Sequence, residues 1–180
     1  MRRLVHGQRN LLRDKAWVIA VLFVFLAKPA NSECLGPSAI QAARSIFEDH
    51  RDFVFGSMVP DFLTPPLAAA LEANLSCRDL GESCAIDWDP WTDAQDGEIG
   101  GPVAYAVNHL DSKTARISVT FSFPGDLRPG ERAERRTVVL QFQRDVSRKC
   151  WLLADLISKG TDLRVVLSRN FGLPEWQKFH

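Results

Sequence analysis

The stretch DWDPWTDAQDG at 87–97 holds the residues of the chain best suited to chemistry. Asp87, Asp89, Asp93 and Glu98 fall at positions 1, 3, 7 and 12 counted from Asp87, which partly matches a calcium-binding EF-hand loop. Positions 5 and 6 are Trp91 and Thr92, where such a loop needs an oxygen ligand and a glycine. The spacing therefore argues against calcium, and we expect neither a metal nor another cofactor.

A structural role fits the same loop better. Aspartate side chains favour turns by bonding nearby backbone amides, and the proline after Asp89 favours an extended or turn conformation. Trp88 and Trp91 are large apolar side chains that can hold a long loop against the domain. A loop that contacts a ligand or partner remains the alternative. The residues concerned are Asp87, Trp88, Asp89, Pro90, Trp91, Gln95 and Asp96.

Three polar residues further along the chain have the types needed for proton transfer, with Asp155 as base and Tyr105 or His109 as donor. Alternation in VAYAVNHL (103–110) puts Tyr105 and His109 on one strand face. In KCWLLADLIS (149–158) it puts Asp155 on a face with Trp151, Leu153 and Ile157. If these two faces line one pocket, the site resembles that of an isomerase.

Each of the three residues also has a purely structural explanation. Tyr105 fits a half-buried aromatic, His109 an exposed strand end, and Asp155 a partner for an arginine or a cap for the region of Thr161. No nucleophile elbow, zinc-protease motif, phosphate loop or dinucleotide-binding glycine pattern occurs in the sequence. We therefore predict a non-catalytic protein, with a pocket enzyme of the isomerase or dehydratase type as the alternative.

The first 32 of the 180 residues have the pattern of a secretory signal. A basic start precedes the apolar run AWVIAVLFVFLA at 16–27, which is shorter than the roughly 20 residues of a membrane span. Small residues before the Ser32–Glu33 bond favour cleavage there, although an uncleaved anchor stays possible. Losing 1–32 removes six of 22 basic and one of 22 acidic residues, which leaves a net charge of −5. We expect a periplasmic or secreted protein that binds no nucleic acid and, after cleavage, is not integral to a membrane.

Four cysteines remain after cleavage, and an even number in an exported chain favours two disulfides. Three pairings are formally open. CRDLGESC at 77–84 is a short loop that can close on itself, which joins Cys77 to Cys84 and leaves Cys34 for Cys150. The paired spacing of a zinc site is missing.

Residues 33–180 suit one domain of the α+β class. We expect N-terminal helices packed on a curved, mainly antiparallel sheet of about four strands, with a short C-terminal helix. The predicted helices cover 36–53, 64–76 and 160–172, and the predicted strands cover 103–110, 115–123, 135–145 and 149–158.

The closing segment CWLLADLISKGTDLRVVL resembles that of nuclear-transport-factor-like cone domains. With the acidic loop, the chain over roughly 40–170 resembles the bacterial envelope family called domain of unknown function 3828. Trp91 stands where that family favours phenylalanine. The matching positions are Asp89, Pro90, Trp91, Gln95, Asp96, Cys150, Trp151 and Asp155.

The resemblance implies a cone-like fold without an agreed activity. Cones of this superfamily often enclose a pocket for small apolar ligands, a few members are isomerases or dehydratases, and others only mediate contacts. We predict an exported protein that binds either a small apolar ligand or a protein partner in the manner of an immunity protein or inhibitor. A ligand binder should have an apolar cavity lined by inward strand residues. A partner-binding protein should have a filled interior and an exposed apolar patch around Trp88 and Trp91.

Overall fold

The structure is a computed structural model that describes residues 34–81, 84–95, 98–124 and 133–171. The predicted targeting segment, 1–32, and the loop residue Asp96 lie outside the described residues, so what was expected of them stays a prediction. The elements follow one another as α1 (Ala39–Asp49), α2 (Pro65–Asp79), β1 (Gly100–Leu110), β2 (Thr114–Phe123), β3 (Glu134–Asp145), β4 (Cys150–Ser158), β5 (Thr161–Asp162) and α3 (Leu163–Asn170).

The architecture is α+β, as predicted, with three helices on one antiparallel open sheet of order β1-β2-β3-β4-β5. A fifth strand replaces the expected first turn of the last helix. Lys159 and Gly160 both have positive φ values, 47° and 79°, as a two-residue hairpin turn of type I′ requires. This turn folds Thr161 and Asp162 back onto β4, so the helix begins only at Leu163.

The helices begin where the sequence places a suitable cap. The side chain of Ser38 accepts a hydrogen bond from the backbone N–H of Gln41 at 3.4 Å, and α1 follows. Pro65 opens α2, where a missing N–H is harmless. No helix in the described ranges is long and apolar enough to cross a membrane.

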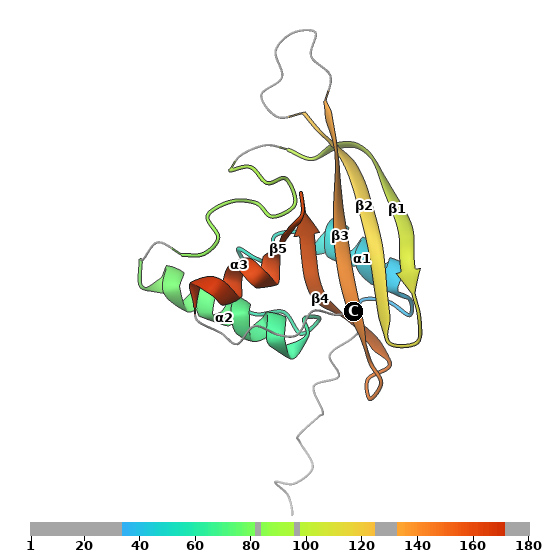
Figure 1. Ribbon diagram of the computed structural model, residues 1–180, viewed down its shortest axis with the longest axis horizontal. Helices are drawn as coiled ribbons and strands as arrows, with labels where there is room; N and C mark the ends of the chain where they lie inside the picture. The colour runs from blue at the N-terminus through green and yellow to red at the C-terminus, as the bar shows by residue number, and fades with distance from the viewer. Residues whose placement is uncertain (1–33, 82–83, 96–97, 125–132, 172–180) are drawn as a thin grey trace, which may run out of the picture. The chain divides into compact units, whose positions relative to one another are not determined.

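The sheet has one face covered by helices and one open face. Strand β2 alternates along its length as predicted, with its inward residues buried: Ala115, Ile117, Val119, Phe121 and Phe123. In Figure 1, α1 lies behind β1 and β2, while α2 and α3 lie on the β4 side. We call the side under the helices the covered face and the other side the open face.

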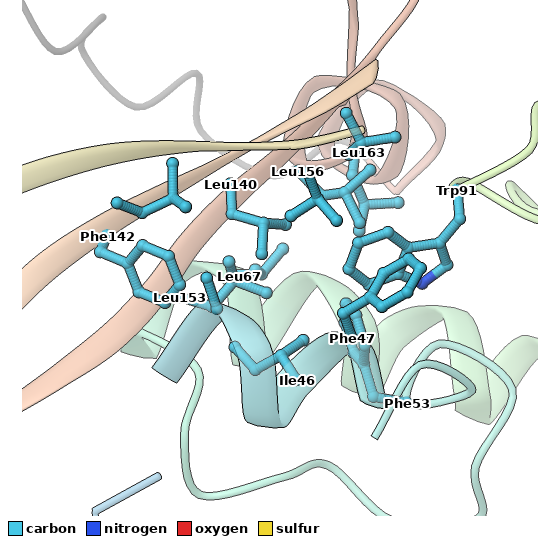
Figure 2. Packing of buried hydrophobic residues seen from close by; sticks show 14 of the residues in the cluster. Ile46, Phe47, Phe53, Leu67, Trp91, Leu140, Phe142, Leu153, Leu156 and Leu163 are labelled. Atoms are coloured by element: carbon cyan, nitrogen blue, oxygen red, sulfur yellow. The ribbon is translucent and has the colours of Figure 1, made fainter. Parts of the chain in front are cut away.

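The core fills the space between the covered face and the helices. Figure 2 shows Phe142 and Leu140 of β3 pointing toward Ile46 of α1 and Leu67 of α2. Each of these four side chains is almost completely buried. Among the described residues the inward strand side chains therefore pack against helix side chains, which matches the filled interior expected of a partner-binding protein rather than the apolar cavity expected of a ligand binder.

Two disulfides are present, with the favoured pairing. Cys34 is joined to Cys150 across 116 residues of sequence, and Cys77 to Cys84 across 7. The Cα atoms are 5.4 and 5.8 Å apart, within the usual range. Disulfides of this kind are typical of exported domains.

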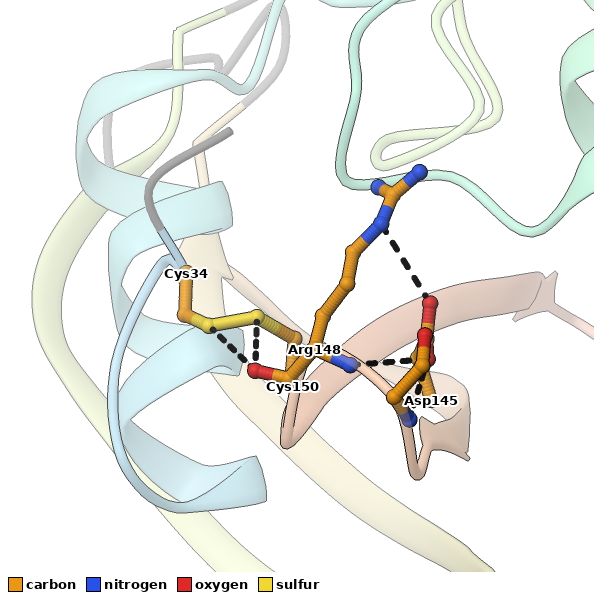
Figure 3. The surroundings of a disulfide bond; sticks show 5 residues. Cys34, Asp145, Arg148 and Cys150 are labelled. Carbon is orange, nitrogen blue, oxygen red and sulfur yellow. Dashed lines mark hydrogen bonds and ion pairs between the residues drawn. A yellow bond between two sulfur atoms is a disulfide. The ribbon is translucent and has the colours of Figure 1, made fainter. Parts of the chain in front are cut away.

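The turn between β3 and β4 presents Cys150 to Cys34 (Figure 3). The carboxylate of Asp145 accepts hydrogen bonds from the backbone N–H groups of Ser147 and Arg148 at 2.9 and 3.1 Å. It also pairs with the Arg148 guanidinium at 3.4 Å. These bonds order the turn, and the disulfide then holds the chain before α1 against the start of β4.

Candidate functional site on the open face of the sheet

A β-bulge in β1 changes the direction of His109. Val107 pairs with Ile117 and His109 with Arg116, so Asn108 is an extra residue in β1. Because one inserted residue reverses the alternation, His109 lies on the open face. Tyr105, before the bulge, lies on the covered face. The prediction that Tyr105 and His109 share a face is therefore wrong.

A second bulge, in β4, has the same effect on Asp155. Leu153 pairs with Phe142 while Asp155 pairs with Gln141, which makes Ala154 the extra residue. Leu153 consequently faces the core, as does Trp151, and Asp155 does not. The prediction that Asp155 shares their face is wrong; only its neighbour Ile157 stays on the same side.

The two bulges align four polar residues across neighbouring strands, which we call the polar row; three of them lie on the open face, whereas Asp155 is 1% exposed and hydrogen-bonded to α3. His109 pairs with Arg116, Arg116 with Gln141, and Gln141 with Asp155. Strands are spaced by about 4.8 Å, so the two ends of the row lie about 14 Å apart. His109 and Asp155 are thus too far apart for direct proton transfer.

A groove of about 670 Å³ lies over part of this row. Toward β1 and β2 it is lined by polar side chains, and toward β3 and β4 by apolar ones. Neither Tyr105 nor Asp155 lines it. Its polar lining comprises Asn108, His109, Asp111, Thr114, Arg116 and Gln141, and its apolar side chains are those of Val139, Ala154 and Ile157; Ala115 and Phe142 also border it, but their side chains are buried in the core.

Arg116 is the positive charge of the groove that has no carboxylate partner among the described residues. Asp111 is already engaged by the backbone N–H groups of Lys113 and Thr114 and by His109 at 2.9 Å. These bonds, the one from Lys113 first, hold the pKa of Asp111 well below its usual range. Arg116 is thus the side chain in the groove with the capacity to bind an external anion.

Tyr105 belongs to the contact between α1 and β1. Its hydroxyl donates to Glu48 at 3.1 Å, its ring packs edge-on against Phe47, and the Arg44 guanidinium lies 4.6 Å from the ring centroid. Burial, and then the bond to Glu48, raises the pKa of Tyr105 to about 12. The hydroxyl therefore stays protonated and occupied, which suits packing better than catalysis.

Asp155 caps the last helix. It is 1% exposed, and its carboxylate accepts a hydrogen bond from the backbone N–H of Arg164, in the first turn of α3, at 3.0 Å. The Arg164 side chain pairs with it at 3.6 Å. Burial raises the pKa of Asp155 to about 6, against the opposing effect of Arg164. These are the two structural roles that the sequence offered for this residue.

The acidic loop is held by Trp91, which is 1% exposed. The indole N–H donates to the carbonyl of Arg51 at 2.8 Å, and the ring meets Phe47 edge-on at 5.3 Å (Figure 2). Asp89 orders the turn by accepting from the Trp91 backbone N–H at 2.9 Å and from the Thr92 hydroxyl at 3.0 Å. These contacts are consistent with the anchoring role predicted for Asp89 and Trp91, which stays a prediction.

The other loop residues are less involved. Pro90 is buried and Trp88 is half-buried, whereas Asp87 and Gln95 are exposed. With Trp91 buried, the described residues form no exposed apolar patch around the two tryptophans. Within the described ranges no three His, Cys, Asp or Glu side chains gather as a metal site would need.

Compared with known proteins, the chain matches no protein-family model and no curated sequence. The functional argument for the groove therefore depends only on the geometry of its residues. Arg116 and Gln141 were not singled out in the sequence, although both stand at outward positions of alternating strands. The adjacent polar pair Asn108–His109 breaks the alternation of β1 and is the local signal of its bulge.

Proposed function

We propose that this is an exported, non-catalytic protein that binds a small ligand with an apolar body and an anionic head in the open-face groove. The observation that carries the proposal is Arg116, a cation with no ion pair in the part of the chain that the structure describes, beside an apolar floor that includes Val139 and Ile157. The proposal replaces the wholly apolar ligand of the sequence prediction, because the groove has two chemically different halves.

Binding would use the two halves separately. A guanidinium can hold a carboxylate or phosphate through two parallel hydrogen bonds, and the amide N–H₂ of Gln141 lies on the neighbouring strand to add a third. The apolar body would cover Val139 and Ile157, with a gain of about 25 cal/mol for each Å² removed from water.

The same residues argue for binding without catalysis. Tyr105 and Asp155 line no part of the groove, and the His109 ring is already hydrogen-bonded to the Asp111 carboxylate. An isomerase or dehydratase needs a base and a donor at one reacting atom. Because its three candidate residues are separated, this alternative has no support from the geometry.

We further propose that the domain is a cone of the nuclear-transport-factor-like kind, belongs with domain of unknown function 3828, and acts in the periplasm or outside the cell. The two disulfides support the compartment, since such bonds persist where thiols are oxidised. Mass analysis of the exported protein would test cleavage at Ser32–Glu33.

The ligand proposal can be tested by calorimetry with straight-chain carboxylates of six to twelve carbons. Alcohols and trimethylammonium compounds of equal chain length serve as ligand controls. We expect the carboxylates to bind, and Arg116→Gln to weaken them by roughly 10- to 100-fold, since a hydrogen bond to a charged group contributes about 1.5–3 kcal/mol. Arg169→Gln, at an exposed site on α3, is the matched control and should change nothing. Equal affinity for carboxylates and alcohols would refute the proposal.

A protein partner is the second candidate, favoured by a different surface. Phe55 and Met58 are 40% and 78% exposed, and Met58 borders a hollow of about 420 Å³ lined also by Phe53 and Phe62. Exposed apolar side chains around a hollow are typical of contact sites. Capture of one envelope protein by the wild type, and its loss with Met58→Glu but not with Val146→Glu at another exposed site, would favour this function.

A further inference from the structure

The two edges of the sheet are treated differently by the rest of the chain. The edge at β4 is covered: Thr64 N–H donates to the carbonyl of Leu153 at 2.9 Å, Leu153 N–H donates to that of Phe62 at 2.8 Å, and β5 pairs beyond them. The edge at β1 pairs with no strand among the described residues (Figure 1). An edge of this length leaves a row of backbone donors and acceptors available.

The middle of β1 lacks the devices that usually protect an edge. From Gly100 to Asn108 the strand has no charged side chain; Pro102 lies within a register shift between Gly100 and Ala104, the bulge at Asn108 lies toward the other end, and Ala104 to Val107 pair regularly between them. Between them Val107, which pairs with the inward-facing Ile117, is 49% exposed. This stretch is suited to accept another strand.

We propose that two copies of this chain pair antiparallel through β1, around a two-fold axis at Tyr105, so that the two sheets become one. Such a register places Val103 of each copy opposite Val107 of the other, on the covered-face side. Ala104 then faces Ala106 on the open-face side, where small side chains allow close approach. The strand is therefore complementary to itself in both size and polarity.

The charges of α1 favour a second copy over an unrelated strand. Arg44 and Glu48 are exposed, one helical turn apart, and both contact Tyr105. A two-fold axis at Tyr105 runs the two α1 helices antiparallel, so Arg44 of one copy faces Glu48 of the other. Because α1 packs over β1 and β2, the two helices would lie about 10 Å apart, close to the usual distance for packed helices.

The first test measures the molar mass of the exported protein by light scattering across a concentration series. We expect a monomer–dimer equilibrium, and Val107→Lys should weaken it by about tenfold or more, since a lysine protects a sheet edge. Val146→Lys, at an exposed valine of the β3–β4 turn, is the matched control and should leave it unchanged. A wild type that stays monomeric at millimolar concentration would overturn the proposal.

The second test identifies the contact. Arg44→Glu or Glu48→Arg alone should weaken the dimer by about fivefold through repulsion, and the double variant should restore it. Amide exchange of 100–110 should slow as concentration rises. A dimer that leaves these amides unprotected, or that the double variant does not restore, would place the contact elsewhere. Protection that needs an added envelope extract would show that the strand comes from another protein, which also overturns the proposal.

Discussion

The two faces of one sheet perform different tasks, and adjacent residues of β2 show this most clearly. Ile117, Val119 and Phe121 are buried against the helices, while Arg116 and Thr120 between and beside them face solvent or the groove. The covered face supplies the apolar burial that stabilises the domain. Side chains on the open face of β2 are less buried, so we expect substitutions there to change stability less.

The largest expected effect is on the covered face. Phe121→Ala should lower the free energy of unfolding by about 4 kcal/mol, because a buried aromatic is replaced by a cavity. Thr120→Ala, one residue away on the open face, should change it by less than about 1 kcal/mol. Denaturant unfolding measures both. Similar losses for the two variants would break the distinction between the faces.

A comparable loss is expected where the acidic loop reaches the core. Trp91→Ala removes a buried ring and its bond to the Arg51 carbonyl, and should destabilise the protein by about 3–4 kcal/mol. Trp88→Ala, at a half-buried ring in the same loop, should lower stability by about 1 kcal/mol. Equal effects would show that both rings anchor the loop.

Asp155 lies at the β4 end of the polar row but is buried, which gives it a pH-dependent effect. Its folded-state pKa, raised to about 6 by burial, exceeds that of the unfolded chain, near 3.8. Its contribution is therefore fully present below pH 4 and is lost as the pH rises through 6, by up to about 3 kcal/mol. Asp155→Asn should lose this dependence. As the pH rises from 4 to 7, the free energy of unfolding of the wild type should therefore fall relative to that of the variant, as measured by urea unfolding. A constant difference would contradict the raised pKa.

The smallest effect on stability is expected at the groove. Arg116→Gln should change the free energy of unfolding by less than about 0.5 kcal/mol, as exposed substitutions usually do. The melting temperature should therefore stay the same while affinity for carboxylates falls. A destabilised variant would mean that the guanidinium supports the fold.

Local patterns predicted the parts of the fold that depend on neighbours in sequence. The alternation of ARISVTFSF identified the buried side of β2, and Ser38 and Pro65 marked the starts of two helices. The short spacing of Cys77 and Cys84 favoured the pairing that is present. Lys159–Gly160 was missed as a turn, because Thr161 and Asp162 after it have the residue types of a helix start.

The candidate site was only partly accessible in this way. The sequence identified His109 and Asp155 as residues of interest. Simple alternation nevertheless misassigned both, because each follows a bulge in its strand. Arg116 and Gln141 became prominent only when pairing across three strands placed them in one row. A pattern within one strand contains no information about its register with another.

The sequence by itself determined the α+β class, the buried side of β2 and the short Cys77–Cys84 loop, because each depends on residue types and on their order or close spacing along the chain. Only the tertiary structure decided which side of the sheet presents the polar groups. Asn108 and Ala154 become extra residues when their strands align with neighbours that lack a counterpart. Each bulge is thus a property of two paired strands, and the direction of every side chain beyond it follows from that pairing.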